Sequence, residues 1–212
     1  GRELPQLKQV FPDLDLCHMV VAENGALLYT PETGRERPLC EPPEESFVRA
    51  LKERGVTPLS VGRVIVATYE PHETTVLQVI KEQGLERQVI FNKGAVMVLP
   101  SGVNKASGLA CALDELSIDA ADVAAVGDAE NDHALLEMCG VGAAVANALQ
   151  SLKDHADLVL TARHGAGVTQ LIERIIDGTI DDTPRRPRIR SKLETKRVHR
   201  LADQHADVHP DA

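Results

Sequence analysis

Short apolar runs that end in glycine or polar residues recur along the chain and predict β-strands. Because these runs are continuously apolar, we expect strands that are covered on both faces. The runs are MVVA at 19–22, VAAVG at 123–127, GAAVA at 142–146 and DLVL at 157–160. Between the later runs, apolar residues recur at helical spacing around 109–116, 135–139 and 168–175. Strand and helix therefore alternate through residues 104–177, which predicts a parallel α/β sheet.

Residues 38–100 follow a different pattern. RVIVATYE at 63–70 alternates apolar and polar positions, and QVIF and AVMVLP at 88–100 flank Asn92-Lys93-Gly94, a typical hairpin turn. Helical patterns lie near 44–54 and 72–83. The sequence thus predicts a small α+β lobe at 38–100, inserted between core segments at 1–37 and 101–180. A basic tail at 181–212 is expected to be disordered.

Composition narrows the classes of partner. The chain has 212 residues, of which 43% are hydrophobic, enough for one core and a small second lobe. Aromatic residues make up 2% and there is no Trp, which argues against a base-stacking nucleic-acid surface. The net charge is −9, and from Thr183 onward the tail carries an excess of basic residues, so the body is more acidic still and would repel polyanions.

Other features favour a cytoplasmic protein. No apolar run approaches the roughly 18 residues that a membrane span needs, so no membrane partner is expected. The four cysteines form no CxxC pair, which fits reduced thiols better than disulfides or a zinc site. The sequence does not define an oligomeric state.

One short segment, VAAVGDAENDHALL at 123–136, gathers Asp128, Glu130, Asn131 and Asp132 directly after a predicted strand. Ligands bind at the carboxyl ends of parallel strands, and two carboxylates with an amide between them suit a Mg²⁺ ion that keeps several waters. A turn that merely caps the next helix is an equally open interpretation. An EF-hand fails on spacing because His133 stands where that loop needs glycine.

A second segment, LPSGVNKASGLACAL at 99–113, places Lys105 at the start of a predicted helix. Such a lysine can neutralise phosphate oxygens. A lone lysine in a first helical turn is more often just an exposed residue. However, a cation is electrostatically unfavourable at that end of a helix unless an anion lies nearby.

These segments, with VGAAVANALQSLKDHADLVLT and HGAGVTQLIERI, resemble the carboxyl-terminal half of the haloacid dehalogenase-like phosphatases, in the Cof-type branch. VVAENGALLY at 20–29 resembles that branch's entry into its cap domain. The resemblance runs from residue 1 to about 178. It implies a Mg²⁺-dependent phosphohydrolase of small phosphorylated metabolites, with a Rossmann-like core, helices on both faces of its sheet, and a mobile α+β cap.

The resemblance also implies roles for individual residues. Lys105 corresponds to the family's phosphate-contacting lysine, Asp128 to its metal-binding aspartate and Asp132 to the second acidic residue beside the metal. Asn131 is expected to order the loop or to contact the phosphate. Asn24 and Gly25 correspond to a turn beside the site, and an ordinary Asn-Gly hairpin turn is the open alternative.

The chain departs from the family in one respect. The family's aspartate nucleophile stands in a DxDGT-like motif, which is absent here, as is the Thr or Ser that follows it; GRELPQL at 1–7 resembles the residues after that Thr or Ser. Asp13 and Asp15 of DLDLC are expected to be solvated. Since the family reacts through an aspartyl-phosphate, we expect the given chain to be inactive. The strand that carries the nucleophile is central in the family's sheet, so its neighbours would expose unpaired edges and the chain is expected to be weakly stable. The alternative function is a noncatalytic interaction or regulatory module that uses the basic tail.

Overall fold

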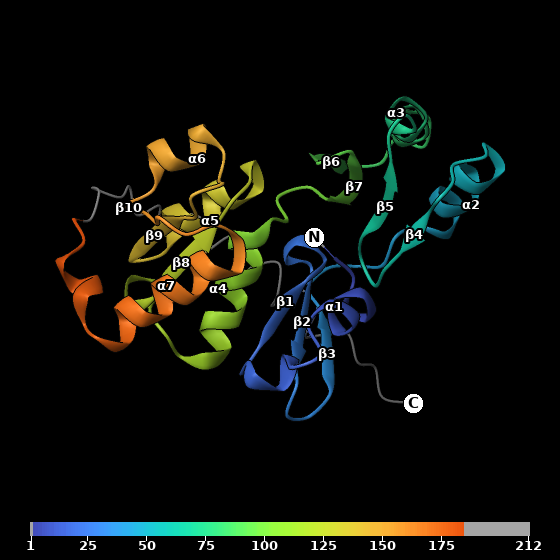
Figure 1. Ribbon diagram of the computed structural model, residues 1–212. Coiled ribbons are helices and arrows are strands. Elements are labelled where there is room, and N and C mark those ends of the chain that lie inside the picture. The colour runs from blue at the N-terminus through green and yellow to red at the C-terminus, as the bar shows by residue number, and fades with distance from the viewer. Residues whose placement is uncertain (1, 185–212) are drawn as a thin grey trace. The chain divides into compact units, whose positions relative to one another are not determined.

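The computed structural model describes residues 2–184, which fall into two compact units divided between Gly108 and Leu109 (Figure 1). Each unit is described by itself. The prediction of an α/β fold with a parallel sheet and a smaller α+β part is confirmed. The division at residues 37 and 100 stays a prediction.

The first unit contains two sheets and the helices that pack on them. Its elements are α1 (Leu4–Val10), η1 (Leu14–Leu16), β1 (Val20–Ala22), η2 (Glu23–Gly25), β2 (Leu27–Thr30), β3 (Arg35–Pro38), α2 (Glu45–Glu53), β4 (Ser60–Val61), β5 (Val66–Tyr69), α3 (Glu73–Glu82), β6 (Arg87–Asn92) and β7 (Ala95–Pro100).

The smaller sheet is an antiparallel meander in the order β1-β2-β3. Helix α1 covers it through Leu4, which packs with Val20, Leu27 and Tyr29. Between α1 and β1, Asp13 and Asp15 are exposed, as expected from the sequence. The predicted strand at 19–22 is therefore present as β1, and the residues that follow it form a hairpin connection to β2.

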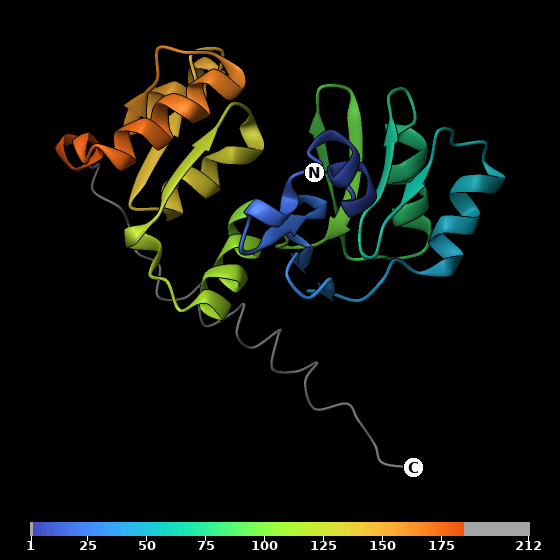
Figure 2. The same ribbon diagram turned by 60° about the horizontal axis from the view of Figure 1, so that its bottom comes forward.

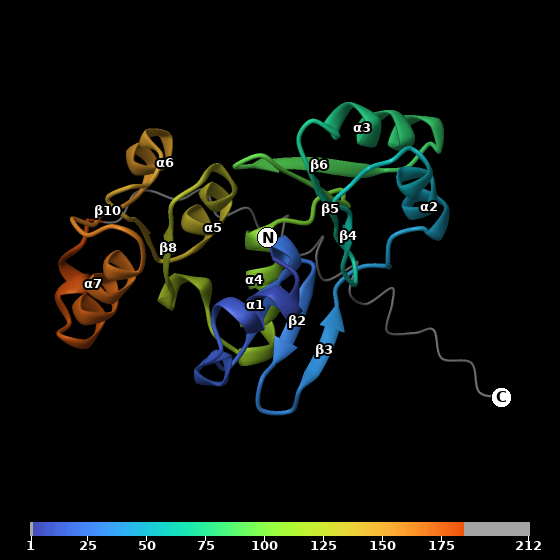
Figure 3. The ribbon, with the colours of Figure 1, turned by 45° about the vertical axis from the view of Figure 1, so that its right-hand side comes forward.

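The larger sheet is antiparallel in the order β4-β5-β7-β6. Helices α2 and α3 cover one of its faces, where Phe47 and Val76 pack against Val66 and Val98 (Figure 3). The predicted hairpin is confirmed: Asn92 pairs with Ala95 across a two-residue turn. Both turn residues have positive φ, which is the conformation of a type I′ turn.

The opposite face of this sheet carries a second apolar cluster. Ile65, Met97 and Leu99 pack there against Ala26, from the turn after β1, and Val103, from the segment that leads into the next helix. This cluster joins the two sheets of the first unit. All the chain's aromatic residues also lie in this unit; they are Phe11, Tyr29, Phe47, Tyr69 and Phe91.

The second unit is a parallel sheet in the order β10-β9-β8 with helices around it (Figure 2). Its elements are the greater part of α4 (Lys105–Leu116), then η3 (Ala120–Asp122), β8 (Ala124–Gly127), η4 (Glu130–Asp132), α5 (His133–Met138), β9 (Val141–Ala144), α6 (Gln150–His155), β10 (Leu158–Val159), α7 (His164–Ile176) and η5 (Thr179–Asp182).

Strand β9 is the central strand of this sheet, and every one of its residues is buried. Leu136 of α5, Leu152 of α6 and Leu171 of α7 belong to the same core as its alanines. This confirms the prediction of a covered strand for the run at 142–146, whereas Val159 in the run at 157–160 is 47% exposed and β1 lies in an antiparallel sheet.

Further sequence expectations concern the cysteines and the tail. The four cysteines carry free thiols. Among residues 2–184 no helix has both the length and the apolar character needed to cross a membrane. The basic segment at 185–200 lies outside the described residues, as does the rest of the tail after Pro184.

Candidate functional site

The acidic segment forms a tight loop at the carboxyl end of β8, and Asp132 holds that loop together. Its side chain is 4% exposed. Its Oδ2 accepts hydrogen bonds from the backbone N–H groups of Asp128 (2.9 Å) and Ala129 (3.1 Å). A side chain at Gly127 would meet this carboxyl group, because an added Cβ would lie 2.5 Å from the Asp132 Cβ. The glycine therefore makes room for the carboxylate that braces the loop.

Asp128 has a different position in the same loop. It is half-buried and directly follows the last residue of β8. Its backbone carbonyl accepts the Leu149 N–H at 3.1 Å, which anchors the loop to the segment before α6. Asn131 is also half-buried, on η4. One oxygen of Asp132 already accepts two loop amides, which leaves that carboxylate less capacity to bind an ion directly.

The donor set of this loop fits Mg²⁺. Carboxylate and amide oxygens are the hard ligands that Mg²⁺ prefers, and the ion commonly binds through one or two carboxylates while it keeps several waters. Within residues 2–184, no three His, Cys, Asp or Glu side chains gather in a group that could hold a metal. An ion at Asp128 would therefore keep most of its coordination sphere as water or as oxygens of a bound ligand.

Lys105 is the first residue of α4, as the sequence predicted. The helix start is fixed by reciprocal hydrogen bonds between Asn104 and Ser107. The Ser107 N–H donates to Asn104 Oδ1 at 3.0 Å, and the Asn104 N–H donates to Ser107 Oγ at 2.9 Å. This capping pair determines where the Lys105 side chain leaves the backbone.

Asn24 and Gly25 lie in the buried connection between β1 and β2, with φ values of 57° and 107°. A Cβ on Gly25 would lie 1.9 Å from the Asn104 carbonyl oxygen. A Cβ on Gly108 would lie 2.5 Å from the Gly25 Cα. The turn is thus a hairpin connection that also packs against the helix carrying Lys105.

The structure brings the predicted residues together in two groups. Asn24 and Gly25 lie beside the helix start of Lys105 in the first unit. Asp128 and Asp132 lie in one loop of the second unit. The convergence of the two groups on one ion and its phosphate stays a prediction.

Sequence reasoning missed Glu23. The residue is 1% exposed, and its carboxylate accepts backbone hydrogen bonds from Arg63, Val64 and Ile65. The signal was a single charged residue inside the apolar run VVAENGALLY. A carboxylate in such a run needs buried donors, but the sequence does not show which ones.

Comparison with known proteins agrees with this fold. A family model described as haloacid dehalogenase-like hydrolase matches residues 59–172. The phosphoglycolate phosphatase 2 of Saccharolobus solfataricus is 31% identical over 163 residues, which span 74% of this chain and 67% of that protein. The chain belongs to the haloacid dehalogenase-like hydrolase family.

Solved structures of haloacid dehalogenase-like hydrolases share the fold. One from Bacteroides thetaiotaomicron has a TM-score of 0.67 at 18% identity and covers 82% of this chain and 84% of that one. A HAD/COF-like hydrolase from Plasmodium vivax has a TM-score of 0.65 at 20% identity, with coverages of 84% and 81%. The predictions of haloacid dehalogenase-like membership and of a phosphoric monoester hydrolase are confirmed, and the fold is that of a HAD/COF-like hydrolase.

Proposed function

We propose that this haloacid dehalogenase-like hydrolase is part of a Mg²⁺-dependent phosphatase of small phosphorylated carboxylic acids. Its relative in Saccharolobus solfataricus is named for phosphoglycolate, a substrate of this kind. The observation that carries the proposal is the loop after β8, in which the buried Asp132 carboxylate braces the backbone around the half-buried Asp128.

Each site residue has its own role in the proposed function. Asp128 binds the ion, and Asp132 keeps the loop in the conformation that presents Asp128. When bound, Mg²⁺ supplies a Lewis acid that offsets the negative charge of the phosphoryl oxygens. Lys105 contributes a second positive charge to the phosphate. Asn131 orders the loop or donates its amide to the phosphate.

The Asn24–Gly25 turn supports the helix start that carries Lys105. Its support comes from backbone packing rather than from a side chain, since Gly25 lies against the Asn104 carbonyl. Glycine is needed there because any side chain would overlap that oxygen, and because φ at this position is positive.

The reaction is proposed to pass through an aspartyl-phosphate. The 212 residues contain no DxDGT-like motif, and the exposed Asp13 and Asp15 lie just before and within η1 rather than at a strand end. The nucleophilic carboxylate is therefore not among the residues that this chain offers. Lys105 has no carboxylate, and the proposal assigns Asp128 and Asp132 to the metal loop, so the chain by itself is expected to bind phosphate without turnover.

A cytoplasmic location is part of the proposal. The four thiols are free, which suits a reducing compartment.

Two experiments test the function. In the first, a DxDGT-bearing segment typical of haloacid dehalogenase-like phosphatases is fused in front of Gly1, and hydrolysis of phosphoglycolate and of an aryl phosphate is measured with Mg²⁺. Turnover that disappears with Asp128→Ala supports the proposal. Turnover that survives Asp128→Ala contradicts the metal assignment, and a folded fusion without any turnover contradicts the function.

The second experiment measures binding in the 212-residue chain by calorimetry, with Mg²⁺ first and inorganic phosphate added afterwards. Asp128→Ala should abolish Mg²⁺ binding, and Lys105→Ala should weaken phosphate binding while Mg²⁺ still binds. The exposed residues Asp15 and Lys81 provide matched controls as Asp15→Ala and Lys81→Ala. Equal losses in the controls would show that bulk charge, not the site, is responsible.

A further inference from the structure

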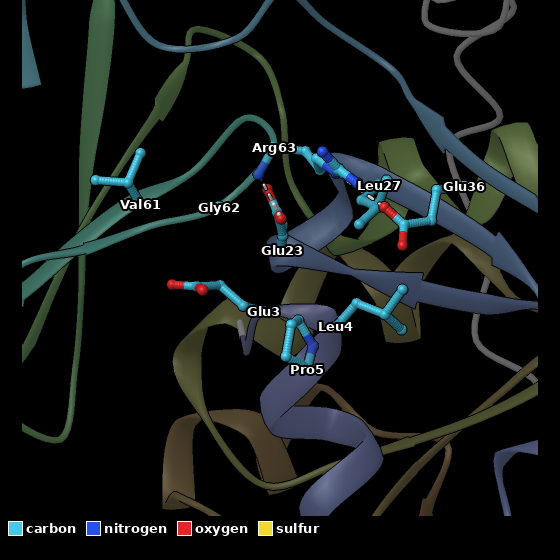
Figure 4. Close-up of a pocket in the computed structure, with 9 residues that line it drawn as sticks. All are labelled: Glu3, Leu4, Pro5, Glu23, Leu27, Glu36, Val61, Gly62 and Arg63. Atoms are coloured by element: carbon cyan, nitrogen blue, oxygen red, sulfur yellow. Dashed lines mark hydrogen bonds and ion pairs between the residues drawn. The ribbon is translucent and has the colours of Figure 1, made fainter. Parts of the chain in front are cut away.

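One buried carboxylate joins two segments of the first unit that are far apart in the sequence. Glu23 Oε1 accepts the Arg63 N–H at 2.9 Å, and its Oε2 accepts the N–H groups of Val64 (2.8 Å) and Ile65 (2.9 Å), as Figure 4 shows for the contact with Arg63. Both carboxylate oxygens are therefore engaged. Because an ionised group is costly to bury without partners, these bonds fix the 62–65 loop onto Glu23.

The fit around this carboxylate is tight. A Cβ on Gly62 would lie 2.4 Å from Glu23 Oε1, so no larger residue fits there without a shift. Glu23 itself has a φ of 52°, which is uncommon for a residue other than glycine. Its backbone N–H also donates to the Arg2 carbonyl at 2.9 Å. Side chain and backbone of Glu23 are thus both held in place.

The 23–25 turn, η2, is in direct contact with the start of α4. Gly25 lies two residues after Glu23 and packs against the Asn104 carbonyl and against Gly108. In a turn this short, a displacement of Glu23 must also displace Gly25. The first turn of α4, which carries Lys105, would then lose the surface on which it rests.

The pocket beside Glu23 offers no charged group that needs a ligand as its partner. It has a volume of about 250 Å³ and is lined by Glu3, Leu4, Pro5, Glu23, Leu27, Glu36, Val61, Gly62 and Arg63 (Figure 4). Its one basic side chain, Arg63, forms an ion pair with Glu36 at 2.8 Å. The carboxylate of Glu23 is occupied by backbone amides, so the charged groups of the pocket already have protein partners.

We propose that Glu23 is a positioning residue: it ties the 62–65 loop to the 23–25 turn and so fixes the first turn of α4, and with it Lys105. Both carboxylate oxygens of Glu23 are engaged by backbone amides, so it acts through the loops that it joins. The part of this inference that concerns phosphate binding rests on the proposed function, whereas the mechanical link does not.

The link is tested by hydrogen exchange on the 212-residue chain and its Glu23→Gln variant. Glutamine keeps the shape but presents an NH₂ group where one carboxylate oxygen accepted, so at least one amide of the 62–65 loop faces another donor. Those amides should exchange at least about tenfold faster. The proposal adds that the amides of Ser107 and Gly108, which are bonded to Asn104, should also exchange faster by several-fold.

Two references make the result decisive. The Val76 amide in α3, bonded to the His72 carbonyl, should be unchanged. Glu36→Gln is the matched control, because it removes a carboxylate from the same pocket without touching the 62–65 amides; it should leave Ser107 and Gly108 at wild-type rates. Faster exchange at 63–65 alone would overturn the proposal, since Glu23 would then hold only its own loop.

Phosphate affinity in the presence of Mg²⁺ is the second readout. Glu23→Gln should weaken phosphate binding several-fold while Mg²⁺ affinity stays at the wild-type value. If the wild-type chain binds no phosphate, the proposed function fails and the exchange rates still decide the link. If the wild type and Glu23→Gln bind phosphate equally, the effect on Lys105 is refuted. If Glu23→Gln does not fold, Glu23→Asp is measured with the same criteria. Its side chain is one methylene shorter, so the carboxylate lies farther from the 62–65 amides.

Discussion

Replacing Asp132 by alanine should destabilise the second unit even in the absence of Mg²⁺. The substitution removes the acceptor for two backbone amides in a residue that is 4% exposed. A hydrogen bond to a charged acceptor contributes about 1.5–3 kcal/mol. After the truncation, water can reach the half-buried Asp128 amide and restore part of the lost hydrogen-bond energy. We therefore expect a loss of about 2–4 kcal/mol in the free energy of unfolding, and about half of that for Asp132→Asn.

Asp128→Ala is the comparison that separates bracing from ion binding. It removes no acceptor of the two loop amides, so we expect a smaller loss than for Asp132→Ala in the absence of metal. Mg²⁺ at about ten times its Kd should stabilise the wild type by about 1.4 kcal/mol, because only the folded loop binds it. Asp128→Ala should lose this stabilisation completely.

The assay is hydrogen exchange of the β9 amides at increasing urea, because β9 is the buried central strand and reports the second unit alone. An Asp132→Ala protein within about 0.5 kcal/mol of the wild type would refute the bracing role. Stabilisation by Mg²⁺ that persists in Asp128→Ala would refute the choice of Asp128 as the ligand.

Three further predictions follow from glycine packing and from one thiol. Gly127→Ala should cost about 1–3 kcal/mol in urea denaturation, because its new methyl group overlaps the carboxyl group that braces the loop; a fully stable variant with unchanged Mg²⁺ affinity would contradict this. Gly25→Ala should cost about 3 kcal/mol or more, since it combines positive φ with overlap on the Asn104 oxygen. Gly102→Ala, which has positive φ (84°) but open space, should cost only about 1–2 kcal/mol in the same assay. Burial raises the pKa of the Cys40 thiol, so stability should be unaffected below its ordinary pKa and fall as pH rises from there through the folded value; alkylation whose pH midpoint is the same in folded and urea-unfolded protein would disprove the shift.

The sequence predicted most elements because local pattern and tertiary role coincide there. The run around Val141 is continuously apolar and becomes a strand buried between helices, and the Asn92–Gly94 segment becomes a two-residue hairpin turn. Lys105 was expected at a helix start and is the first residue of α4. In each case the neighbours in the chain supply the signal.

What the sequence could not give are contacts between distant residues. Asp128 and Asp132 look alike in the motif, yet one oxygen of Asp132 is bonded to loop amides. Spacing alone does not show which carboxylate turns inward. The partners of Glu23 lie some forty residues away along the chain, so no local pattern indicates them.

The confinement of every phenyl and phenol ring to the first unit has a practical consequence. Absorbance and fluorescence of tyrosine arise from Tyr29 and Tyr69, so these signals do not report on the second unit. A single tryptophan placed at Ile176, which is 80% exposed, would give that unit its own optical probe. Tyrosine absorbance would then report unfolding of the first unit, and tryptophan fluorescence would report unfolding of the second unit in the same sample.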